Sequence, residues 1–245
     1  MKVLLTGASG HVGQAILGDL ADEYEWRLLD LEHPGHDAPG EVFVGSVTDE
    51  ELVAEAVEGV DAVIHLAGDP RPEAGWDSVL ENNINGTYVV FKAAADEGVG
   101  RIAFASSNHA VGAFETEGRI PDIYRTDSTF RLDGSELPRP GNLYGVSKAT
   151  GELLGRWLHD TFETSVACVR IGNLTKDHPP KDYERGQAMW LSYPDCAHLF
   201  DRCLQASYGY LIVYGISNND RRYYSLEPAR TMLGYQPQDN SAEFE

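Results

Sequence analysis

Short runs of β-forming apolar residues alternate with stretches of helical periodicity along the whole chain, and this alternation limits the folds that it can adopt. The expected strands are KVLLT, WRLLD, EVFVG, DAVIHLA, RIAFASS, SVACVRI and YLIVYG. The expected helices cover 11–21, 49–58, 74–97, 142–163 and 194–207. Strands that alternate with helices form right-handed βαβ units. We therefore predict an α/β fold with a doubly wound parallel sheet and helices on both faces.

Two local features refine this expectation. The segment TDEE at 48–51 places Thr48 and Glu51 in the capping-box pattern, so we expect Thr48 to cap the helix over 49–58. Between Gly112 and Gly141 the chain has several Pro, Gly and charged residues and weak periodicity. This stretch is longer than ordinary connections between a strand and a helix. We expect it to form a lid or a site loop.

Acidic residues outnumber basic ones: 39 Asp and Glu stand against 19 Lys and Arg, the net charge is −20, and five of the basic residues are lysines. The strong periodicity excludes disorder as the explanation. An acidic, lysine-poor surface keeps a folded protein hydrated in high salt. We expect a halophilic setting, with an ordinary acidic mesophilic protein as the alternative. Nucleic acids and anionic membranes are disfavoured as partners, because their phosphates are repelled.

The sequence also indicates a compartment. No stretch approaches the ~20 apolar residues of a membrane span, and the opening residues MKVLLTGASG have the pattern of a strand and a turn rather than of a secretory signal. Cys168, Cys196 and Cys203 are odd in number and lack metal-ligand spacing. We expect reduced core cysteines, no metal site and a cytoplasmic location.

The segment TGASGHVG follows the first expected strand and opens a helix, with Gly7, Gly10 and Gly13 three residues apart. Glycines there permit a tight turn, close approach of the backbone to a pyrophosphate and packing of the helix on the strand. Asp30 ends the second strand, where a carboxylate accepts from the adenosine ribose hydroxyls and repels a 2′-phosphate. The pattern predicts a Rossmann-like site that favours NAD over NADP. The alternative for Asp30 is a solvated strand end.

A second group of motifs suggests catalysis. FASSNHAVG ends a strand in polar residues, at the sheet edge where ligands bind in α/β folds. LYGVSKATGELL places Tyr144 and Lys148 four residues apart on one helix face. A lysine ammonium beside a tyrosine stabilises the phenolate and lowers its pKa, which makes the tyrosine a usable general base. This spacing is common by itself, but together with the glycine loop and the serine-ended strand it identifies a family.

On these motifs the whole chain resembles the extended short-chain dehydrogenase/reductase family. The resemblance implies that Tyr144 is the base, that Lys148 holds the nicotinamide ribose and tunes Tyr144, and that Ser107 hydrogen-bonds the reacting oxygen. Ser106 is expected to face the cofactor or to pack, and Asn83 to brace the site. The residues expected to contact NAD are Gly7, Gly10, His11, Val12, Gly13, Asp30, Leu31, Ser46, Val47, Leu66, Ala67, Gly68, Asn83, Ser106, Tyr144, Lys148 and Ile171.

The substrate is expected to be a small sugar. Asn108 and His109 stand where dehydratases of this family carry acidic residues after the serine, so the acid/base pair for elimination is absent. SSNHAVG together with VRIGN resembles the uronate dehydrogenases, in which Asn and His hold sugar hydroxyls and the arginine matching Arg170 grips a carboxylate. The alternatives are an Arg170 paired with a surface acid and a His109 that is an ordinary buried histidine.

A closer resemblance, over nearly the whole chain, is to the NAD-dependent glucose-6-phosphate dehydrogenases of haloarchaea. It is most specific in HLAGDPRPEAGWDSVLENN, FRLDGSELPRPGNLYGVSK and RIGNLTKDHPPKDYERGQAMWLSYPDC. A phosphate dianion needs more cationic donors than a carboxylate does, and basic residues cluster in the last of these segments. The residues expected to contact the substrate are Arg71, Ser107, Asn108, His109, Tyr144, Arg170, Lys176, Lys181 and Arg185.

The expected activity is the NAD-dependent oxidation of glucose 6-phosphate at C1 to 6-phosphoglucono-1,5-lactone. The alternatives are a uronate dehydrogenase and, more remotely, a non-catalytic dinucleotide-sensing protein. We expect one Rossmann-like domain over 1–245 with a small C-terminal substrate-binding region, and substrate-site segments at about 69–76, 107–141 and 170–193. The family resemblance also implies a homodimer through the helices at 74–97 and 142–163.

Overall fold

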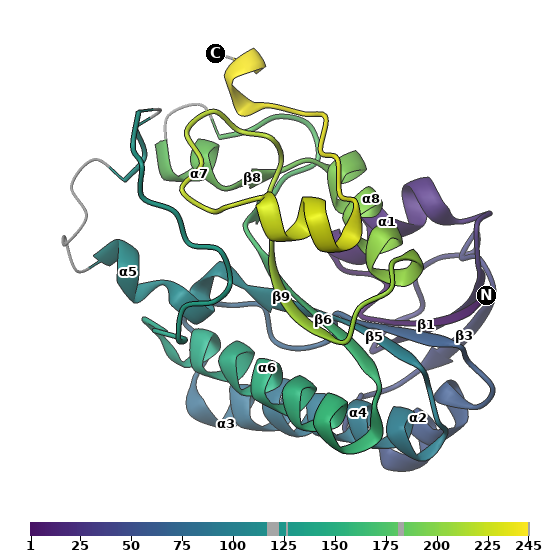
Figure 1. Ribbon diagram of the computed structural model, residues 1–245. Helices are drawn as coiled ribbons and strands as arrows, with labels where there is room; N and C mark the ends of the chain where they lie inside the picture. The colour runs from purple at the N-terminus through teal and green to yellow at the C-terminus, as the bar shows by residue number, and fades with distance from the viewer. Residues whose placement is uncertain (117–122, 126, 181–183, 245) are drawn as a thin grey trace.

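A parallel sheet forms the centre of the structure, a computed structural model that describes residues 1–116, 123–125, 127–180 and 184–244. Its seven strands run in the order β3-β2-β1-β4-β5-β6-β9, and each neighbouring pair is parallel (Figure 1). The strands are β1 (Lys2–Thr6), β2 (Glu25–Asp30), β3 (Glu41–Val44), β4 (Ala62–His65), β5 (Arg101–Ser107), β6 (Ser165–Ile171) and β9 (Tyr210–Gly215). The predicted Rossmann-like doubly wound sheet is confirmed.

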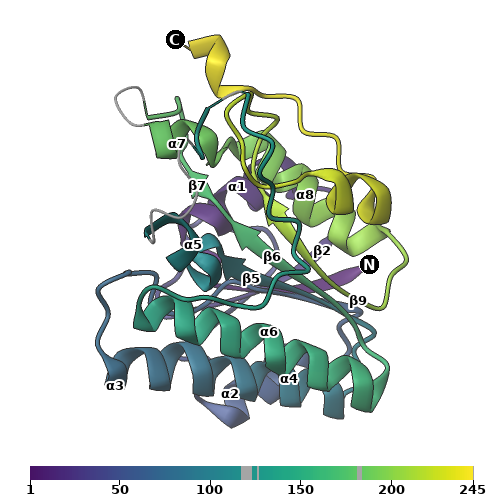
Figure 2. The ribbon, with the colours of Figure 1, turned by 60° about the vertical axis from the view of Figure 1, so that its left-hand side comes forward.

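Helices cover both faces of this sheet (Figure 1, Figure 2). One face carries α2 (Glu50–Val57), α4 (Gly86–Asp96) and α6 (Leu143–Phe162), and the other carries α1 (His11–Leu20) and α8 (Tyr193–Gln205). Side chains alternate along β1, so that Val3 and Leu5 pack in the core beneath α1 and α8, whereas Leu4 packs in the core on the opposite face. Because both faces are covered, the strands are apolar throughout, as the sequence runs indicated.

The helix expected over 74–97 is interrupted. It consists of α3 (Trp76–Ser78), a π-helical turn η1 (Val79–Asn85) and α4, which continue one another along one edge of the molecule. π-Helical turns inside α-helices are frequent at functional sites. Here the turn contains Asn83, whose side chain is buried. The interruption is invisible to a period-based prediction, because one turn of a different pitch hardly changes the apolar pattern.

The start of α2 differs from the prediction by one residue. Asp49, not Thr48, is the N-cap, and its carboxylate accepts a hydrogen bond from the Leu52 amide at 3.1 Å. The Thr48 hydroxyl instead hydrogen-bonds the Ser46 hydroxyl at 2.8 Å. The capping-box assignment to Thr48 is therefore wrong. The sequence offers two cap residues in succession, and the turn after β3 determines which one reaches the helix.

Several short elements follow the main strands. They are the 3₁₀ turn η2 (Asn108–Val111), α5 (Ala113–Thr116), β7 (Asn173–Leu174), α7 (Glu184–Ala188), β8 (Trp190–Leu191), the π-helical turn η3 (Ala229–Leu233) and the 3₁₀ turn η4 (Ser241–Phe244). All of them except η3, which packs on α8, lie beyond the C-terminal ends of β5, β6 and β9 (Figure 1). β7 and β8 pair in parallel, apart from the main sheet. Elements this short are below the length that periodicity detects, and the sequence analysis did not include them.

The long connection expected over 113–141 lies partly outside the described residues, which omit 117–122 and 126. Its later part crosses the end of the sheet, where Leu132 forms an isolated parallel bridge with Tyr224. The three cysteines are buried and free. Within the described ranges, none of the helices has the length and apolar character needed to cross a membrane.

Candidate active site

A cavity of about 860 Å³ opens at the C-terminal edge of the sheet. The ends of β1, β2, β4, β5 and β6 contribute to its walls, together with the first turns of α1 and α6. The strand order reverses direction between β1 and β4, so the cavity lies at the topological switch point. Ligands of open α/β sheets bind in this crevice.

The glycine loop forms one wall. Gly7 has a φ of +75°, and a Cβ there would come within 2.8 Å of the Ala67 amide nitrogen, so the turn needs glycine. At Gly13 a Cβ would overlap the Ala8 carbonyl, which explains the close packing of α1 on β1. Gly10 is the N-cap of α1 and supplies no side-chain acceptor. The first amides of this helix therefore remain available to a pyrophosphate.

Asp30 ends β2 at the far side of this wall. Its two carboxylate oxygens accept from the Ser9 amide at 2.8 Å and from the Leu31 amide at 2.7 Å. Each oxygen keeps lone-pair capacity for a ribose hydroxyl, and the fixed negative charge opposes a 2′-phosphate. The glycine turn, the free helix end and this carboxylate fit an adenine dinucleotide.

The remaining predicted cofactor residues divide into two groups. Of the residues expected to contact NAD, all but Gly13 and Asn83 line the cavity. Those that line it are Gly7, Gly10, His11, Val12, Asp30, Leu31, Ser46, Val47, Leu66, Ala67, Gly68, Ser106, Tyr144, Lys148 and Ile171. Asn83 instead contacts a lining residue, Asp69: its side-chain amide accepts from the Asp69 N–H at 2.6 Å and donates to the Asp69 carbonyl at 3.0 Å. NAD contact by these residues stays a prediction.

Ser107, Tyr144 and Lys148 meet at the end of β5. Ser107 is the last residue of that strand, while Tyr144 and Lys148 project from one face of α6. The Lys148 ammonium donates to the Ala105 carbonyl at 2.8 Å and lies 5.6 Å from the centre of the Tyr144 ring. Burial lowers the pKa of Lys148 to about 8.

The predicted lowering of the Tyr144 pKa by Lys148 stays a prediction, because the pKa of this phenol in the protein alone is raised overall. Burial raises the pKa of Tyr144, and a hydrogen bond with Ser107 offsets part of this increase. The physical reason is that desolvation of the phenolate outweighs its polar contacts. Lys148 contacts the Ala105 carbonyl and the face of the ring rather than the hydroxyl.

Asn108 and His109 follow the serine in the 3₁₀ turn, and neither lines the cavity. Asn108 is buried, accepts from the Ser107 hydroxyl at 3.2 Å and directs its amide to the Met189 sulfur at 3.4 Å. His109 packs edge-on against the Tyr144 ring, with 5.5 Å between the ring centres, and its Nδ1 hydrogen-bonds the Asn142 side chain at 3.0 Å. His109 is thus adjacent to Tyr144, whereas Asn108 contacts Ser107 and not the Tyr144 ring.

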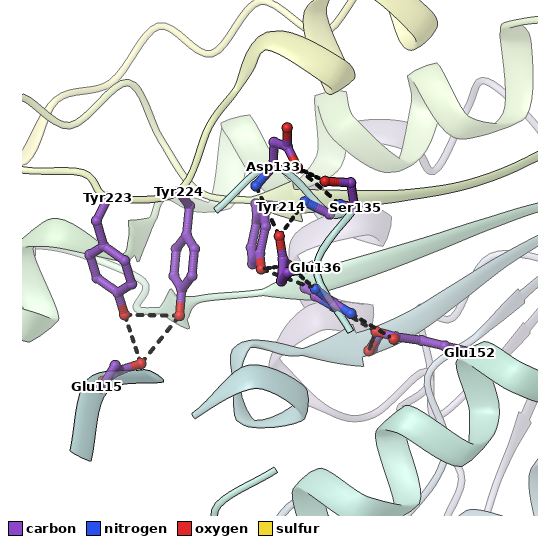
Figure 3. Close-up of polar contacts among 11 residues, drawn as sticks. Glu115, Asp133, Ser135, Glu136, Glu152, Tyr214, Tyr223 and Tyr224 are labelled. Carbon is purple, nitrogen blue, oxygen red and sulfur yellow. Dashed lines mark hydrogen bonds and ion pairs between the residues drawn. The ribbon is translucent and has the colours of Figure 1, made fainter. Parts of the chain in front are cut away.

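Arg170 lies apart from the cavity lining. It is the penultimate residue of β6, beside Ser106, and its side chain is fully buried. Nε and Nη2 donate to the two carboxylate oxygens of Glu152 at 2.8 and 2.9 Å, and Nη1 donates to Glu136. Figure 3 shows Glu136 and Glu152, the two residues whose carboxylates form ion pairs with this guanidinium. Two carboxylates therefore hold Arg170 away from the cavity in the protein alone, and its contact with the substrate stays a prediction.

The carboxylates of this cluster make further bonds. Glu152 also accepts from the Ser106 hydroxyl at 2.6 Å, so the residue before Ser107 is tied to α6. Glu136 accepts from the amides of Asp133 and Gly134 at 3.1 and 3.0 Å (Figure 3). The buried cluster thus joins β5, β6, α6 and the long connection at one point.

The other predicted cationic residues are dispersed. Arg71 lines the mouth of the cavity. Arg185 in α7 donates to Glu115 in α5, which also accepts from the Tyr223 hydroxyl at 2.7 Å (Figure 3). Arg185 is close enough to His109 to contribute, after burial, to lowering the pKa of that histidine. Lys176 is exposed. Lys181 lies outside the described residues.

Sequence reasoning missed three carboxylates that organise the site: Glu152, Asp69 and Glu136. Glu152 had a signal, since it follows Lys148 by four residues and continues the helix face that carries Tyr144. Asp69 directly follows the LAG segment and could have been suspected from that position. Glu136 lies in the aperiodic connection, where no pattern marks an inward-facing residue.

Comparison with known proteins agrees with this geometry. A model of the NAD dependent epimerase/dehydratase family matches residues 3–189. The chain belongs to this family. The predicted membership of the extended short-chain dehydrogenase/reductases is thereby confirmed.

Three individual proteins illustrate the similarity. The NAD-dependent glucose-6-phosphate dehydrogenase of Haloferax volcanii is 66% identical over 248 residues, which cover 99% of this chain and 95% of that protein. The uronate dehydrogenase of Pseudomonas putida is 36% identical, with coverages of 99% and 86%. A solved structure of a mutant uronate dehydrogenase from Agrobacterium tumefaciens complexed with NAD has a TM-score of 0.85 at 33% identity, covering 99% of this chain and 86% of that one.

The buried cluster yields a stability prediction. Arg170→Met leaves Glu152 and Glu136 without their cation, and breaking a buried ion pair in this way lowers the free energy of unfolding by about 3–5 kcal/mol. Urea unfolding measures it. Adding Glu152→Gln should recover part of the loss, because it removes the uncompensated charge. Arg156→Met, which breaks the exposed pair with Asp160, is the control. A loss no larger than that of the control would contradict the assignment.

Lys148 yields a pH prediction. Its pKa is about 8 in the folded protein, against 10.5 for an ordinary lysine, so the unfolded chain binds this proton more tightly. Burying the ammonium therefore destabilises the fold below about pH 8, and this penalty disappears as the pH rises to about 10.5. The free energy of unfolding of the wild type, relative to Lys148→Met, should increase across this window. Lys92→Met, at an exposed site, should show no such trend. A difference independent of pH would contradict the lowered pKa.

Proposed function

We propose that this protein catalyses the NAD-dependent oxidation of glucose 6-phosphate at C1, giving 6-phosphoglucono-1,5-lactone. The observation that carries the proposal is the 66% identity, over nearly the full length of both chains, to a protein named NAD-dependent glucose-6-phosphate dehydrogenase. The placement of Ser107, Tyr144 and Lys148 around a cavity with a dinucleotide-type glycine loop supports it. NAD is favoured as the cofactor by the fixed carboxylate of Asp30.

Each catalytic side chain has one role in this proposal. Tyr144, as the phenolate, takes the proton of the C1 hydroxyl, and Ser107 donates a hydrogen bond to the oxygen that becomes the lactone carbonyl. Lys148 supplies a positive charge next to the Tyr144 ring. His109, packed against that ring, orients the neighbouring sugar hydroxyls. Bound NAD supplies the hydride acceptor.

The phosphate group requires cations, and we propose Arg71 and Arg185 for it, with Lys176 and Lys181 as further candidates. Arg71 supports the assignment best, because it lines the mouth of the cavity and its side chain is 63% exposed. Arg185 lies near His109. A dianion held between two guanidinium groups has more donors than a carboxylate needs.

Tyr144→Phe tests the catalytic role. The change removes the base but keeps the ring, so we expect kcat with glucose 6-phosphate to fall by ~10²–10⁴, while NAD binding, followed by titration, changes little. Tyr88→Phe, at an exposed tyrosine of α4, is the matched control. Near-wild-type turnover of the Tyr144 variant would refute its role as the base.

The substrate is tested by steady-state assays with NAD. We expect kcat/KM for glucose 6-phosphate to exceed that for glucuronate by at least about tenfold, because a tenfold preference needs only about 1.4 kcal/mol. A higher value for glucuronate would favour the uronate dehydrogenase alternative. NAD binding without NADH formation from either sugar would favour a dinucleotide sensor.

We further propose a homodimer. Large apolar side chains are exposed on the two neighbouring helices that the sequence analysis named, namely Leu80, Tyr88, Leu153, Trp157 and Phe162. Exposed apolar side chains that gather on neighbouring helices are expected at an interaction site. A second copy is its proposed partner, because the helices pack side by side and would form a four-helix interface around a two-fold axis (Figure 2).

Light scattering after gel filtration tests the dimer. The wild type should have twice the chain mass, and Leu153→Glu, which places a charge on the helix surface, should shift it to the monomer. Met232→Glu, at an exposed apolar residue in η3, should leave the mass unchanged. A monomeric wild type at micromolar concentration would refute the proposal.

We also propose a salt-rich cytoplasm as the setting. The support is the composition, with 39 acidic against 19 basic residues. The relative from Haloferax volcanii points in the same direction.

A further inference from the structure

Asp69 has a fixed position at the mouth of the cavity. It follows the LAG segment after β4, and both its backbone N–H and its carbonyl bond to the Asn83 side chain. The same Asn83 amide donates to the Ser147 hydroxyl at 3.1 Å, and that hydroxyl donates to the Tyr144 carbonyl at 2.7 Å. A short chain of hydrogen bonds thus sets the Asp69 backbone relative to the helix turn that carries Tyr144.

The Asp69 side chain is equally constrained. Its carboxylate accepts from the Ser78 hydroxyl at 2.6 Å, from Arg71 Nε at 2.9 Å, from Arg71 Nη2 at 2.6 Å and from the Arg71 amide at 3.1 Å. These bonds, first among them those from Arg71, hold the pKa of the carboxyl well below its usual range. Asp69 therefore stays ionised and paired across the working pH range.

The pair is asymmetric in exposure. The Asp69 side chain is 7% exposed, whereas that of Arg71 is 63% exposed. Nε and Nη2 face the carboxylate, so Nη1 lies on the outer edge of the guanidinium. By contrast, the Arg125–Asp127 pair in the long connection is exposed on both sides, at 61% and 67%. In the Asp69–Arg71 pair, the buried carboxylate fixes the position of an arginine whose guanidinium remains exposed.

Two effects of Asp69 on an arriving anion oppose each other. Holding the guanidinium in one place reduces the side-chain freedom that binding would otherwise remove, which favours the anion. The charge of the carboxylate repels the anion. In molar salt the Debye length is about 3 Å, so the part of this repulsion that acts through solvent is weakened, whereas a direct hydrogen bond from Nη1 is not. The positioning effect therefore prevails in a salt-rich cytoplasm.

We infer that Asp69 is a specificity-determining positioning residue that holds the Arg71 guanidinium at the cavity mouth to bind the phosphate group of a sugar phosphate. This inference rests on the proposed function. It assigns to Asp69 no contact with the reacting atoms, since it acts through Arg71. Selection of a phosphorylated over an unphosphorylated sugar thereby depends on a carboxylate that carries the same sign of charge as the substrate.

Asp69→Asn tests the inference in molar KCl. The variant keeps the backbone bonds to Asn83 but loses the charge and the two-oxygen grip on Arg71. We expect KM for glucose 6-phosphate to rise at least about fivefold, with KM for NAD within about twofold of the wild type. Because the Asp69 charge also raises the pKa of Tyr144, kcat is compared on the alkaline plateau of the pH profile, where it should stay within about twofold. The kcat/KM ratio of glucose 6-phosphate to glucose should fall by the same factor. Asp160→Asn, in an exposed pair on α6, should change none of these values.

A merely structural role would give a different result, in which kcat, both KM values and thermal stability change together. That outcome, or an unchanged ratio of the two sugars, would overturn the inference. Ser78→Ala removes one donor to the carboxylate without changing its charge, and it should raise KM for glucose 6-phosphate in the same direction. If Asp69→Asn folds poorly, this second variant decides: an unchanged KM would overturn the inference.

Arg71→Met separates the inference from the proposed function. If it raises KM for glucose 6-phosphate while Asp69→Asn does not, Arg71 binds phosphate without support from Asp69, and the inference is wrong. If Arg71→Met leaves KM unchanged, the assignment of Arg71 fails and the inference fails with it, whether or not the protein oxidises glucose 6-phosphate. The double variant should match Arg71→Met, and additive effects would overturn a role through Arg71.

Discussion

The region around the cavity depends on the buried ion pairs of the Arg170 guanidinium with Glu152 and Glu136. Removing an arginine and two carboxylates from water is unfavourable unless their hydrogen-bonding groups find partners. Those partners come from separate parts of the chain: Glu152 from α6, Glu136 from the long connection and Tyr214 from β9. The cluster is satisfied only when all of these parts have assembled. We therefore expect α6, the adjoining strands of the sheet and the long connection to fold as one unit.

The arginines around the site share one arrangement, because positive charges are few in this chain. In a chain with twice as many acidic as basic residues, Arg71, Arg170 and Arg185 each donate to a carboxylate. Because all three are paired, pairing does not distinguish their roles, but the exposure of their side chains does. Arg170 is fully buried and serves the fold, while Arg71 has a buried acid and an exposed outer edge that can receive a ligand. Basic residues near a site thus cannot be sorted into structural and binding ones by sequence position alone.

The sequence predicted the features that follow from local pattern. Strand positions, helix faces, the glycine turn at Gly7 and the Tyr144 and Lys148 spacing all result from periodicity or backbone conformation, and the structure contains them. The pairing of Arg170 could not be predicted, because it depends on Glu136, a residue 34 positions earlier in an aperiodic connection. The raised pKa of Tyr144 could not be predicted either, because burial depends on the complete fold. The direction of Asn108, whose amide points to Met189, was equally unpredictable, because Met189 lies in a segment of short elements without a detectable period.

The π-helical turn at Val79–Asn85 has a consequence for how one helix serves two surfaces. In a regular α-helix each residue advances the side-chain direction by about 100°, so the direction of Asn83 would fix that of Tyr88. The wider turn accommodates an additional residue and changes the angular relation between the segments on either side of it. Asn83 faces inward toward Asp69, and Tyr88, five residues later, faces outward. Because five residues of a regular α-helix already place two side chains about 140° apart, the turn adjusts the angle between the inner and the outer face of this helix rather than creating the two faces.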